Sequence, residues 1–310
     1  MSSGEVYLMV YSNRSELVEE SGETKIFEEG SVSSETEKRT AIIKKTLSNG
    51  FLERRILECR KGIEINIDPE HKQFLDSIVD AVTGQRGRAI VGVTILQCCI
   101  KCIVPEQDIR LHKGGNNRRD FSWVDGIPMR SIDKPFITPV LRKYDLLKLN
   151  ADGFMMTRTL AENYPYSKVY KAQIRGARDQ WLIVVDLLEK MELNAGNALN
   201  YLLSRLINKS DEFHALADHV VAAVQLKVKE GISFPEIYKI IEKLIDSSNY
   251  AARVFEIALH SLYQVFDANG EFEYELKPLT QMRSANLKHG NIGDIEIIES
   301  KGVVSRTLCI

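Results

Sequence analysis

Apolar residues recur at helical spacing along most of this chain and predict a largely helical protein. In the first two thirds they predict five helices, over residues 37–59, 69–82, 88–103, 151–163 and 170–189. Asn49-Gly50 is a candidate break within the first of these helices. Asp68 and Pro69 suit the N-cap and the first turn of the second. The third contains the apolar run Ile90–Ile103, interrupted only by Thr94, Gln97 and Lys101, so we expect that helix to be buried.

Four further helices are predicted in the last third of the chain. Residues 195–207 and 212–229 form two separate segments, and the second should turn five apolar side chains inward: Leu216, Val220, Val221, Val224 and Leu226. Ser233, three residues before Glu236, is a candidate N-cap for the next helix. Residues 249–266 predict the last one.

Alternation with a period of two, which is typical of β-strands, occurs near both ends of the chain. Residues 6–11 predict a strand, whereas residues 12–40 are rich in Glu, Ser and Gly and are expected to be partly disordered. Residues 271–276 predict a second strand, and residues 295–298 predict a short buried one. The predicted fold class is therefore α+β, a predominantly helical body with a small C-terminal β element.

The composition is typical of a cytoplasmic globular protein. The chain has 310 residues, of which 44% are hydrophobic and 27% charged, enough for a sizeable core. Its five cysteines include Cys99 and Cys102 in a Cys-x-x-Cys spacing, but no second pair completes a zinc site. Because the pair lies inside an apolar run, we expect buried thiols. The odd cysteine count and an acidic start without a secretory signal predict a reducing cytoplasm and no membrane attachment.

Charge is unevenly distributed, although the formal net charge is only −2. The first 40 residues carry nine acids against four bases, whereas residues 105–143 carry eight bases against five acids. Within the second range lies the small, polar and basic loop 113–119, which contains Arg118 and Arg119. Such a loop can become ordered on a polyanion, and it can equally be an ordinary solvated loop. Charge alone leaves both interpretations open.

Motifs for common catalytic and nucleotide chemistry are missing from the sequence. It contains six histidines but no His-x-x-x-His pair and no Ser/His/Asp elbow motif. It also lacks a Walker A loop and a dinucleotide fingerprint. We therefore expect no nucleotide cofactor on this chain.

Candidate chemistry is concentrated near the C-terminus. Glycines bracket a turn there, and Asp294 stands where that turn enters the predicted strand 295–298. A carboxylate in this position suits Mg²⁺, which binds a few carboxylates and completes its shell with water and phosphate oxygens. The preceding segment 283–289 contributes Arg283 and Lys288, cations that suit a phosphate backbone. The competing interpretation is a surface β-hairpin with ordinary turn residues.

Residues 125–189 carry a series of short motifs in a fixed order. They are Arg130-x-x-Asp133, Ile137-Thr138-Pro139-x-Leu141, Gly153-x-x-x-Thr157-Arg158 and Pro165-Tyr166, and a further string runs from Gln281 to Asp294. This order resembles bacterial type II restriction endonucleases that occur with cytosine-5 methyltransferases, including components of multi-subunit BsuMI-like restriction systems. The resemblance covers residues 105–301, and these strings are more specific than any single short motif.

The resemblance implies a component of a type II site-specific deoxyribonuclease that cleaves double-stranded DNA by Mg²⁺-dependent phosphodiester hydrolysis, with other subunits of the system as partners. It implies that Asp294 is the metal ligand and that Glu299 and Lys301 are candidate catalytic residues. The candidate DNA-binding residues are Arg118, Arg119, Arg130, Arg158, Arg283 and Lys288. Arg130 and Arg158 lie inside the motifs and have two possible roles. They can contact guanine edges, or they can stabilise the fold by pairing with Asp133 or Asp152.

The sequence departs from the family pattern where the second half of the site is expected. In such folds an acid-x-Lys step lies on the next strand, but residues 303–310 contain no carboxylate and no lysine. Glu299 and Lys301 have the required spacing, yet they follow Asp294 by only five and seven residues. Either these residues act within a compressed hairpin, or the chain carries half a site and a partner completes it.

Three regions are therefore expected. Residues 1–68 form a partly disordered N-terminal region, and residues 69–190 form a helical region with the basic loop and the candidate DNA-binding segment. Residues 191–310 form a helical region that leads into the start of a nuclease core. The alternative function is a non-catalytic DNA-recognition or assembly subunit of a restriction-modification system, and a third is a helical scaffold that binds only protein.

Overall fold

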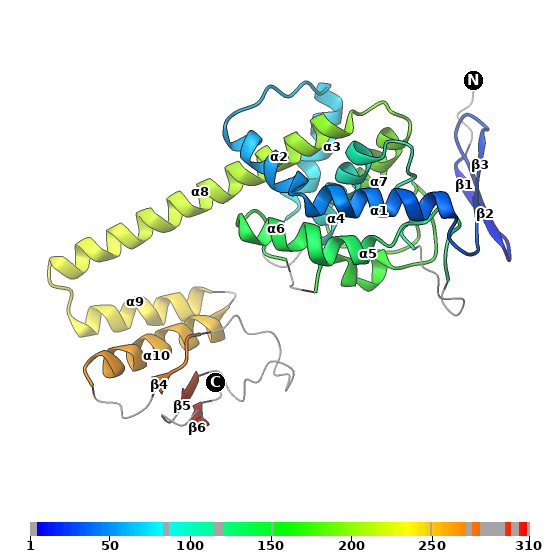
Figure 1. Ribbon diagram of the computed structural model, residues 1–310. Coiled ribbons are helices and arrows are strands. Elements are labelled where there is room, and N and C mark those ends of the chain that lie inside the picture. The colour runs from blue at the N-terminus through cyan, green and yellow to red at the C-terminus, as the bar shows by residue number, and fades with distance from the viewer. Residues whose placement is uncertain are drawn as a thin grey trace. The chain divides into compact units, whose positions relative to one another are not determined.

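Ten α-helices and two three-stranded antiparallel sheets make up the described part of the chain (Figure 1). The computed structural model describes residues 5–82, 87–113, 121–149, 152–248, 250–270, 275–279, 295–298 and 304–308. The chain divides into two compact units, unit 1 (Met1–Ala217) and unit 2 (Asp218–Ile310). The fold is α+β and mostly helical, as the sequence predicts. Among the described residues, no helix has both the length and the apolar character that crossing a membrane requires.

The N-terminal segment forms an antiparallel sheet where partial disorder was expected. Its strands are β1 (Tyr7–Val10), β2 (Arg14–Val18) and β3 (Thr24–Glu28), in that order. Leu17 and Phe27 are buried and pack with Leu111 and Trp123, which lie far along the chain. The prediction for residues 12–40 is wrong because the polar composition conceals these alternating positions, which are buried by a distant partner.

Helices α1 (Ser34–Ser48) and α2 (Phe51–Arg60) confirm the predicted helix and its break, since Gly50 adopts a left-handed conformation between them. Helix α3 (Pro69–Asp80) begins where Asp68 and Pro69 predict. The Asp68 side chain nevertheless makes no capping hydrogen bond. Local sequence therefore locates this helix start correctly, although the carboxylate does not cap it.

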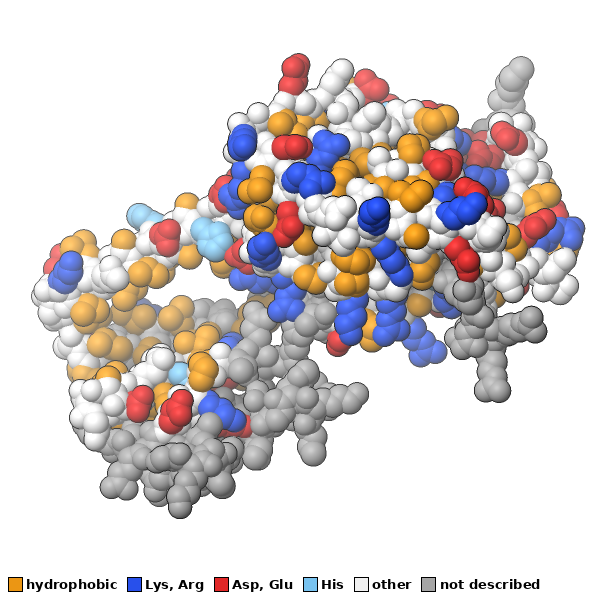
Figure 2. Space-filling view, viewed as in Figure 1, with side chains coloured by type: hydrophobic (Ala, Val, Ile, Leu, Met, Phe, Trp, Pro, Cys, Tyr) orange, Lys and Arg blue, Asp and Glu red, His pale blue; other side chains and the backbone are white. Residues whose placement is uncertain are grey.

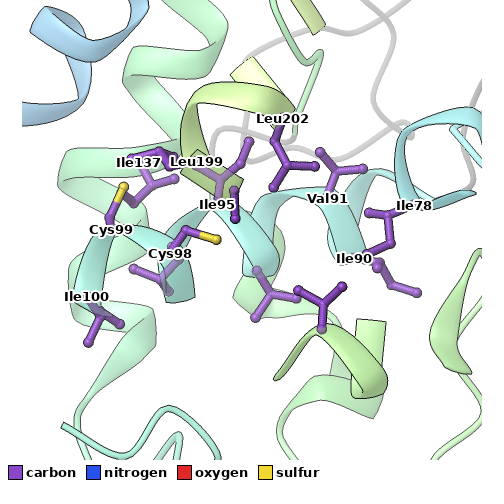
Figure 3. Packing of buried hydrophobic residues seen from close by; sticks show 14 of the residues in the cluster. Ile78, Ile90, Val91, Ile95, Cys98, Cys99, Ile100, Ile137, Leu199 and Leu202 are labelled. Atoms are coloured by element: carbon purple, nitrogen blue, oxygen red, sulfur yellow. The ribbon is translucent and has the colours of Figure 1, made fainter. Parts of the chain in front are cut away.

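Helix α4 (Arg88–Ile103) has the predicted bounds and lies at the centre of unit 1. In Figure 3, Ile95 of α4 packs among residues of several other elements, including Ile137 and Leu199. Cys98 and Cys99 are fully buried, and burial raises the pKa of both thiols well above the usual value. Of the predicted buried pair, Cys99 is confirmed as buried, whereas Cys102 is half-buried, and burial raises the pKa of its thiol to about 11. Raised pKa values disfavour the reactive thiolate form.

The middle of unit 1 is built from short elements. They are α5 (Met129–Ile132), the π-helix η1 (Asp133–Ile137), α6 (Thr138–Lys143), and the two 3₁₀ turns η2 (Phe154–Met156) and η3 (Arg158–Leu160). The helix predicted over residues 151–163 is therefore wrong. Gly153 has a φ of +90°, which few other residues adopt, and the backbone turns there instead of continuing a helix.

Helix α7 (Arg178–Glu189) begins eight residues later than predicted. Its Trp181 donates a 2.8 Å hydrogen bond from the indole nitrogen to Gln97 of α4. Ahead of α7, the chain is held by its side chains: the Tyr170 hydroxyl donates to the carbonyl of Thr159 at 2.8 Å. Side-chain contacts of this kind fix residues 170–177 without helical hydrogen bonds.

Helix α8 (Ala195–Lys229) is one helix of 35 residues where two were predicted. The residues that join the predicted pair, 208–211, include no glycine or proline, so nothing interrupts the helix. Only residues up to Ser210 are buried. The five side chains predicted to face inward are each more than half exposed: Leu216, Val220, Val221, Val224 and Leu226. The two units divide within this helix, after residue 217, and the predicted boundaries at 68 and 190 do not separate them.

Unit 2 contains a helical hairpin and the second sheet. Helices α9 (Phe234–Ser247) and α10 (Ala251–Ala268) lie side by side (Figure 1). The predicted cap of α9 is present: the Glu236 carboxylate accepts hydrogen bonds from the Ser233 backbone and hydroxyl. Strands β4 (Glu275–Leu276), β5 (Ile295–Ile298) and β6 (Val304–Leu308) pair antiparallel in that order. The predicted short strand is thus confirmed as β5.

Candidate functional site

Most of the predicted site residues lie outside the described residues. These are the catalytic candidates Asp294, Glu299 and Lys301 and the DNA-binding candidates Arg118, Arg119, Arg283 and Lys288. Arg130 and Arg158 are described, and both belong to unit 1. The geometry that bears on function therefore comes from the surroundings of these two arginines and from the side chains next to Asp294 in the sequence.

Asp133 joins three of the four motifs in unit 1. It ends the first motif, and its side chain is fully buried. Thr138, from the second motif, donates a 2.6 Å hydrogen bond to its Oδ1, and Met155, inside the third, donates its backbone N–H to Oδ2 at 3.1 Å. A Cβ on Gly153 would overlap Oδ2, so the backbone of the third motif approaches as only glycine allows.

The electrostatics of Asp133 reflect a carboxylate held by fixed donors. Burial raises the pKa of its carboxyl above the usual value, and the hydrogen bonds from Thr138 and Met155 oppose that rise. A buried carboxylate is costly unless donors satisfy it. Asp133 therefore ties α5, which carries Arg130, to α6 and η2.

Tyr166, from the fourth motif, is a core residue. Its hydroxyl donates to the carbonyl of Leu160, the last residue of η3, at 2.7 Å. Its ring stacks on His112 at 5.0 Å between centroids and meets Trp181 edge-on at 4.8 Å. The Pro-Tyr motif thus anchors the segment that carries Arg158 to the aromatic core.

The helical rod α5–η1–α6 has one buried and one basic side. Its buried side chains include Met129, Ile132, Asp133, Ile137, Thr138 and Leu141. We call its exposed cations the basic face; they are Arg130, Lys134, Arg142 and Lys143. In Figure 2, lysine and arginine side chains gather along the edge of unit 1 that carries α5 and α6. Arg158 is also exposed, and it lies on η3, which adjoins η2.

Arg130 and Arg158 do not brace the fold through the two predicted aspartates. Asp133 is satisfied by Thr138 and Met155, and Asp152 lies 3.7 Å from Lys134. Neither arginine side chain makes a hydrogen bond or ion pair with any residue that the structure describes. Their guanidinium groups are exposed, and they can take a ligand without breaking a described contact.

The second candidate location is an acid–lysine pair in unit 2. Lys277, just after β4, places its Nζ 2.6 Å from Oε2 of Glu296 on β5, and the Glu296 side chain is 4% exposed. The backbone N–H of Lys277 also donates to the carbonyl of Glu296 at 3.0 Å. His260 of α10 donates from Nε2 to the carbonyl of Lys277 at 2.8 Å. Lys277 therefore links α10 to the sheet at Glu296. Glu296 is one residue after Ile295 and two after Asp294.

The described side chains do not by themselves fit the expected Mg²⁺. Within the described ranges, no group of three or more His, Cys, Asp or Glu side chains is placed to hold a metal ion. The buried Glu296 is paired with Lys277, and Glu256 of α10 is paired with Arg253 at 2.6 Å. The predicted ligand Asp294 lies outside the described residues, so no catalytic step can be derived through the metal.

Sequence patterns gave no signal for the acid–lysine pair. Alternation places Glu296 on the opposite side of β5 from Ile295 and Ile297, which predicts an exposed carboxylate. The structure buries all three residues, which lie on the central strand of the sheet. The sequence also gave no sign that Asp133 accepts hydrogen bonds from Thr138 and Met155, although its place in the first motif marks it as a residue of interest.

Comparison of the chain with protein families, with curated proteins and with solved structures found no match in any of the three.

Proposed function

We propose that this protein is a component of a type II restriction endonuclease and that it binds double-stranded DNA through the basic face and Arg158. The observation that carries this proposal is that Arg130 and Arg158 are exposed side chains on supported elements, without a side-chain partner among the described residues. Arg130 lies on α5, which ends at the buried Asp133, and Arg158 lies on η3, which Tyr166 anchors. Arginine is the most frequent reader of guanine edges and also binds phosphates. Rigidly supported arginines suit both tasks.

Duplex DNA suits this surface better than a small anion. The basic face extends along a rod of fifteen residues, from Met129 to Lys143. Four cations spaced along the rod can follow a phosphate backbone, in which charges recur every few ångströms. Of these cations, Lys134 and Lys143 make described ion pairs, with Asp152 and Glu53. Both pairs are at the surface, where an ion pair contributes little and DNA can displace it.

The cleavage part of the proposal assigns Mg²⁺ binding to Asp294. It is supported by the sequence resemblance and by one feature of unit 2: the buried Glu296, two residues after Asp294, lies on β5 and pairs with Lys277. Glu299 and Lys301 remain the proposed completion of the site, with Lys301 stabilising charge on the attacked phosphate.

A non-catalytic recognition or assembly subunit is the second candidate. It is favoured by the division of the chain, because the arginines lie in unit 1 whereas Asp294 lies in unit 2. Binding and cleavage are then separable, and a partner protein can supply the chemistry. The expected outcome for this candidate is DNA binding without cleavage by any form of this chain.

The deciding experiment is plasmid cleavage, with and without Mg²⁺, by the chain alone and with the products of neighbouring genes. Site-specific cleavage that requires this chain and Mg²⁺ supports the proposal. Asp294→Ala should abolish that cleavage while DNA binding persists. Lys301→Ala and Glu299→Ala test the compressed hairpin, since both should also abolish cleavage if it operates.

The outcomes separate the candidates. If Asp294→Ala and Lys301→Ala both leave restriction by the full system unchanged, the catalytic assignment fails and the subunit role holds. If the chain also fails to bind duplex DNA in a gel-shift assay, the whole proposal fails. Arg60→Ala serves as a matched control, because Arg60 is a surface arginine of α2 whose ion pair with Asp211 is long, at 3.5 Å.

A further inference from the structure

A cleft of about 590 Å³ lies in unit 1 along helices α3 and α7. Its apolar wall is formed by Phe74 of α3 and by Leu182, Ile183 and Leu187 of α7. Clefts that bind small molecules usually measure about 300–1,000 Å³ and are lined by apolar side chains with a few polar ones. The size and the wall of this cleft therefore suit a small organic ligand.

The wall is preformed because both helices are anchored in the core of unit 1. Leu75 of α3 is fully buried, and Trp181 of α7 donates its 2.8 Å hydrogen bond to Gln97 of α4. Of the four wall residues, only Leu182 is buried, and the other three are half-buried. The cleft thus offers apolar surface to a ligand without rearrangement of the helices.

Five titratable side chains also line the cleft: Glu70, His71, Lys168, Asp179 and Glu192. Three of them have described partners. Lys168 pairs with Glu20 and Asp179 with Arg178, and His71 lies 3.9 Å from Asp68. The carboxylates of Glu70 and Glu192 have no partner among the described residues. The cleft therefore carries two negative charges that no described cation offsets.

Glu70 and Glu192 converge on one end of the cleft. Asn197 donates a 2.7 Å hydrogen bond from Nδ2 to the carbonyl of Asn66, and the backbone N–H of Glu192 donates to the carbonyl of Leu187 at 3.0 Å. These bonds bring the start of α3, which carries Glu70, close to the turn after α7, which carries Glu192. Two carboxylates beside an apolar wall favour a cation, because low-dielectric walls concentrate their field.

We propose that this cleft binds a small organic cation with an apolar body, of the arylalkylamine type. The ammonium group lies between the carboxylates of Glu70 and Glu192, and the aromatic ring packs on Phe74 and Ile183. Aromatic pairs gain energy beyond their area of contact, so an aromatic body suits a wall that contains Phe74. The site uses no residue of the basic face and does not depend on the proposed DNA binding.

A small ligand fits this cleft better than a protein partner does. Neither α3 nor α7 exposes a large apolar side chain outside the cleft. A specific protein interface buries about 800 Å² on each partner, around a core that is more apolar than its rim. The surface beside the cleft does not supply such a core.

Isothermal titration calorimetry of the full chain with tryptamine tests this proposal. The expected result is binding at one site per chain with a Kd on the order of 1 mM or tighter, the range for a ligand of this size. Indole-3-propionate keeps the ring but carries a carboxylate, and ethylamine keeps the ammonium but lacks the ring. Both should bind at least about 10-fold more weakly than tryptamine.

Glu70→Gln combined with Glu192→Gln should raise the Kd for tryptamine about 3- to 10-fold, the effect of two ion pairs that are open to solvent. The matched control combines Glu23→Gln with Glu106→Gln, because both of these acids are exposed and lie outside the cleft. Thermal melting establishes that both double variants remain folded. The comparison of the three ligands uses the wild-type chain and does not depend on any variant.

Three results overturn the proposal. The first is no binding of tryptamine up to about 10 mM. The second is equal binding of ethylamine or of indole-3-propionate, because the cleft then does not combine a charge with an apolar wall. The third is an affinity for tryptamine that the Glu70 and Glu192 substitutions leave unchanged, or that the control substitutions lower equally.

Discussion

The Thr138 hydroxyl donates a 2.6 Å hydrogen bond to the carboxylate of Asp133, and both side chains are fully buried. The same carboxylate accepts the backbone N–H of Met155. The Asp133 side chain, at the end of α5, thus contacts both α6 and η2. Its removal should affect both stability and the support of Arg130.

Asp133→Ala is expected to lower the free energy of unfolding by about 2–4 kcal/mol. The substitution leaves the Thr138 hydroxyl and the Met155 N–H buried without their acceptor. Urea denaturation measures the loss. Asp152→Ala is the control, because the Asp152 side chain is 59% exposed and its removal should change stability by less than about 0.5 kcal/mol. Equal effects of the two substitutions would contradict the role of Asp133.

The buried pair Lys101–Glu189 supports a second prediction. Lys101 Nζ lies 3.0 Å from Glu189 Oε1, and the side chains are 7% and 5% exposed. Burial, and next the charge of Asp108, raise the pKa of Glu189, whereas Lys101 lowers it. Glu189→Gln leaves the lysine charge buried without its counter-ion and should cost about 3–5 kcal/mol in unfolding free energy.

Replacing both partners, with Lys101→Met and Glu189→Leu together, should cost less than Glu189→Gln alone, because no unpaired charge remains. Glu20→Gln is the surface control: Glu20 pairs with Lys168 at 3.1 Å, but both side chains are about half exposed. Its cost should stay below about 1 kcal/mol. Chemical denaturation of the wild type, the Glu189→Gln variant, the double variant and the Glu20→Gln variant measures the four unfolding free energies. Their comparison distinguishes the effect of an unpaired buried charge from a general loss of polar contacts.

His112 should make the stability of the folded protein sensitive to acid. Its side chain is buried, and burial, with the charge of Lys113, lowers the pKa of the imidazole to about 3. The unfolded ring has a pKa of about 6.5. As pH falls from 6.5 towards 3, the unfolded chain takes up a proton that the folded chain does not, so stability is lost across this window. The loss approaches about 1.4 kcal/mol per pH unit.

His112→Phe isolates this contribution, because a phenyl ring can keep the stacking on Tyr166 but cannot be protonated. The difference in unfolding free energy between wild type and variant should be constant above pH 7. Below pH 6.5 it should shift in favour of the variant. A difference that does not vary between pH 7 and pH 4 would show that His112 is freely protonated in the folded state.

Arg130 and Arg158 allow a test of DNA reading. If either contacts a guanine edge, its replacement by Ala should cost about 1–3 kcal/mol on specific DNA and much less on random DNA. If it contacts phosphate, both DNAs should lose affinity equally, and the salt slope should decrease by about one. Fluorescence anisotropy at several salt concentrations separates these outcomes.

Arg60→Ala should leave both affinities unchanged. A flat salt dependence of the wild-type chain would count against DNA as the ligand. Equal loss of binding together with a lowered melting temperature for Arg158→Ala would indicate that the arginine braces the fold. No described contact of Arg158 predicts such a loss of stability.

The sequence by itself determined the helices whose signals are local. The bounds of α4 follow from its long apolar run, the break at Gly50 from an Asn-Gly pair, and the start of α9 from the Ser233–Glu236 cap. The buried strand β5 was also predicted. These features depend on residues within a few positions of one another, where propensity and capping chemistry act.

Only the tertiary structure decided which partner each segment has. Phe27 packs against Trp123 in the core. The Asp133 carboxylate accepts hydrogen bonds from Thr138 and Met155. The buried Glu296 pairs with Lys277. Conversely, the apolar side of α8 beyond Ser210 has no described cover, although its pattern predicts burial. Periodicity shows that a side chain is suited to burial, but long-range contacts determine whether and by what it is buried.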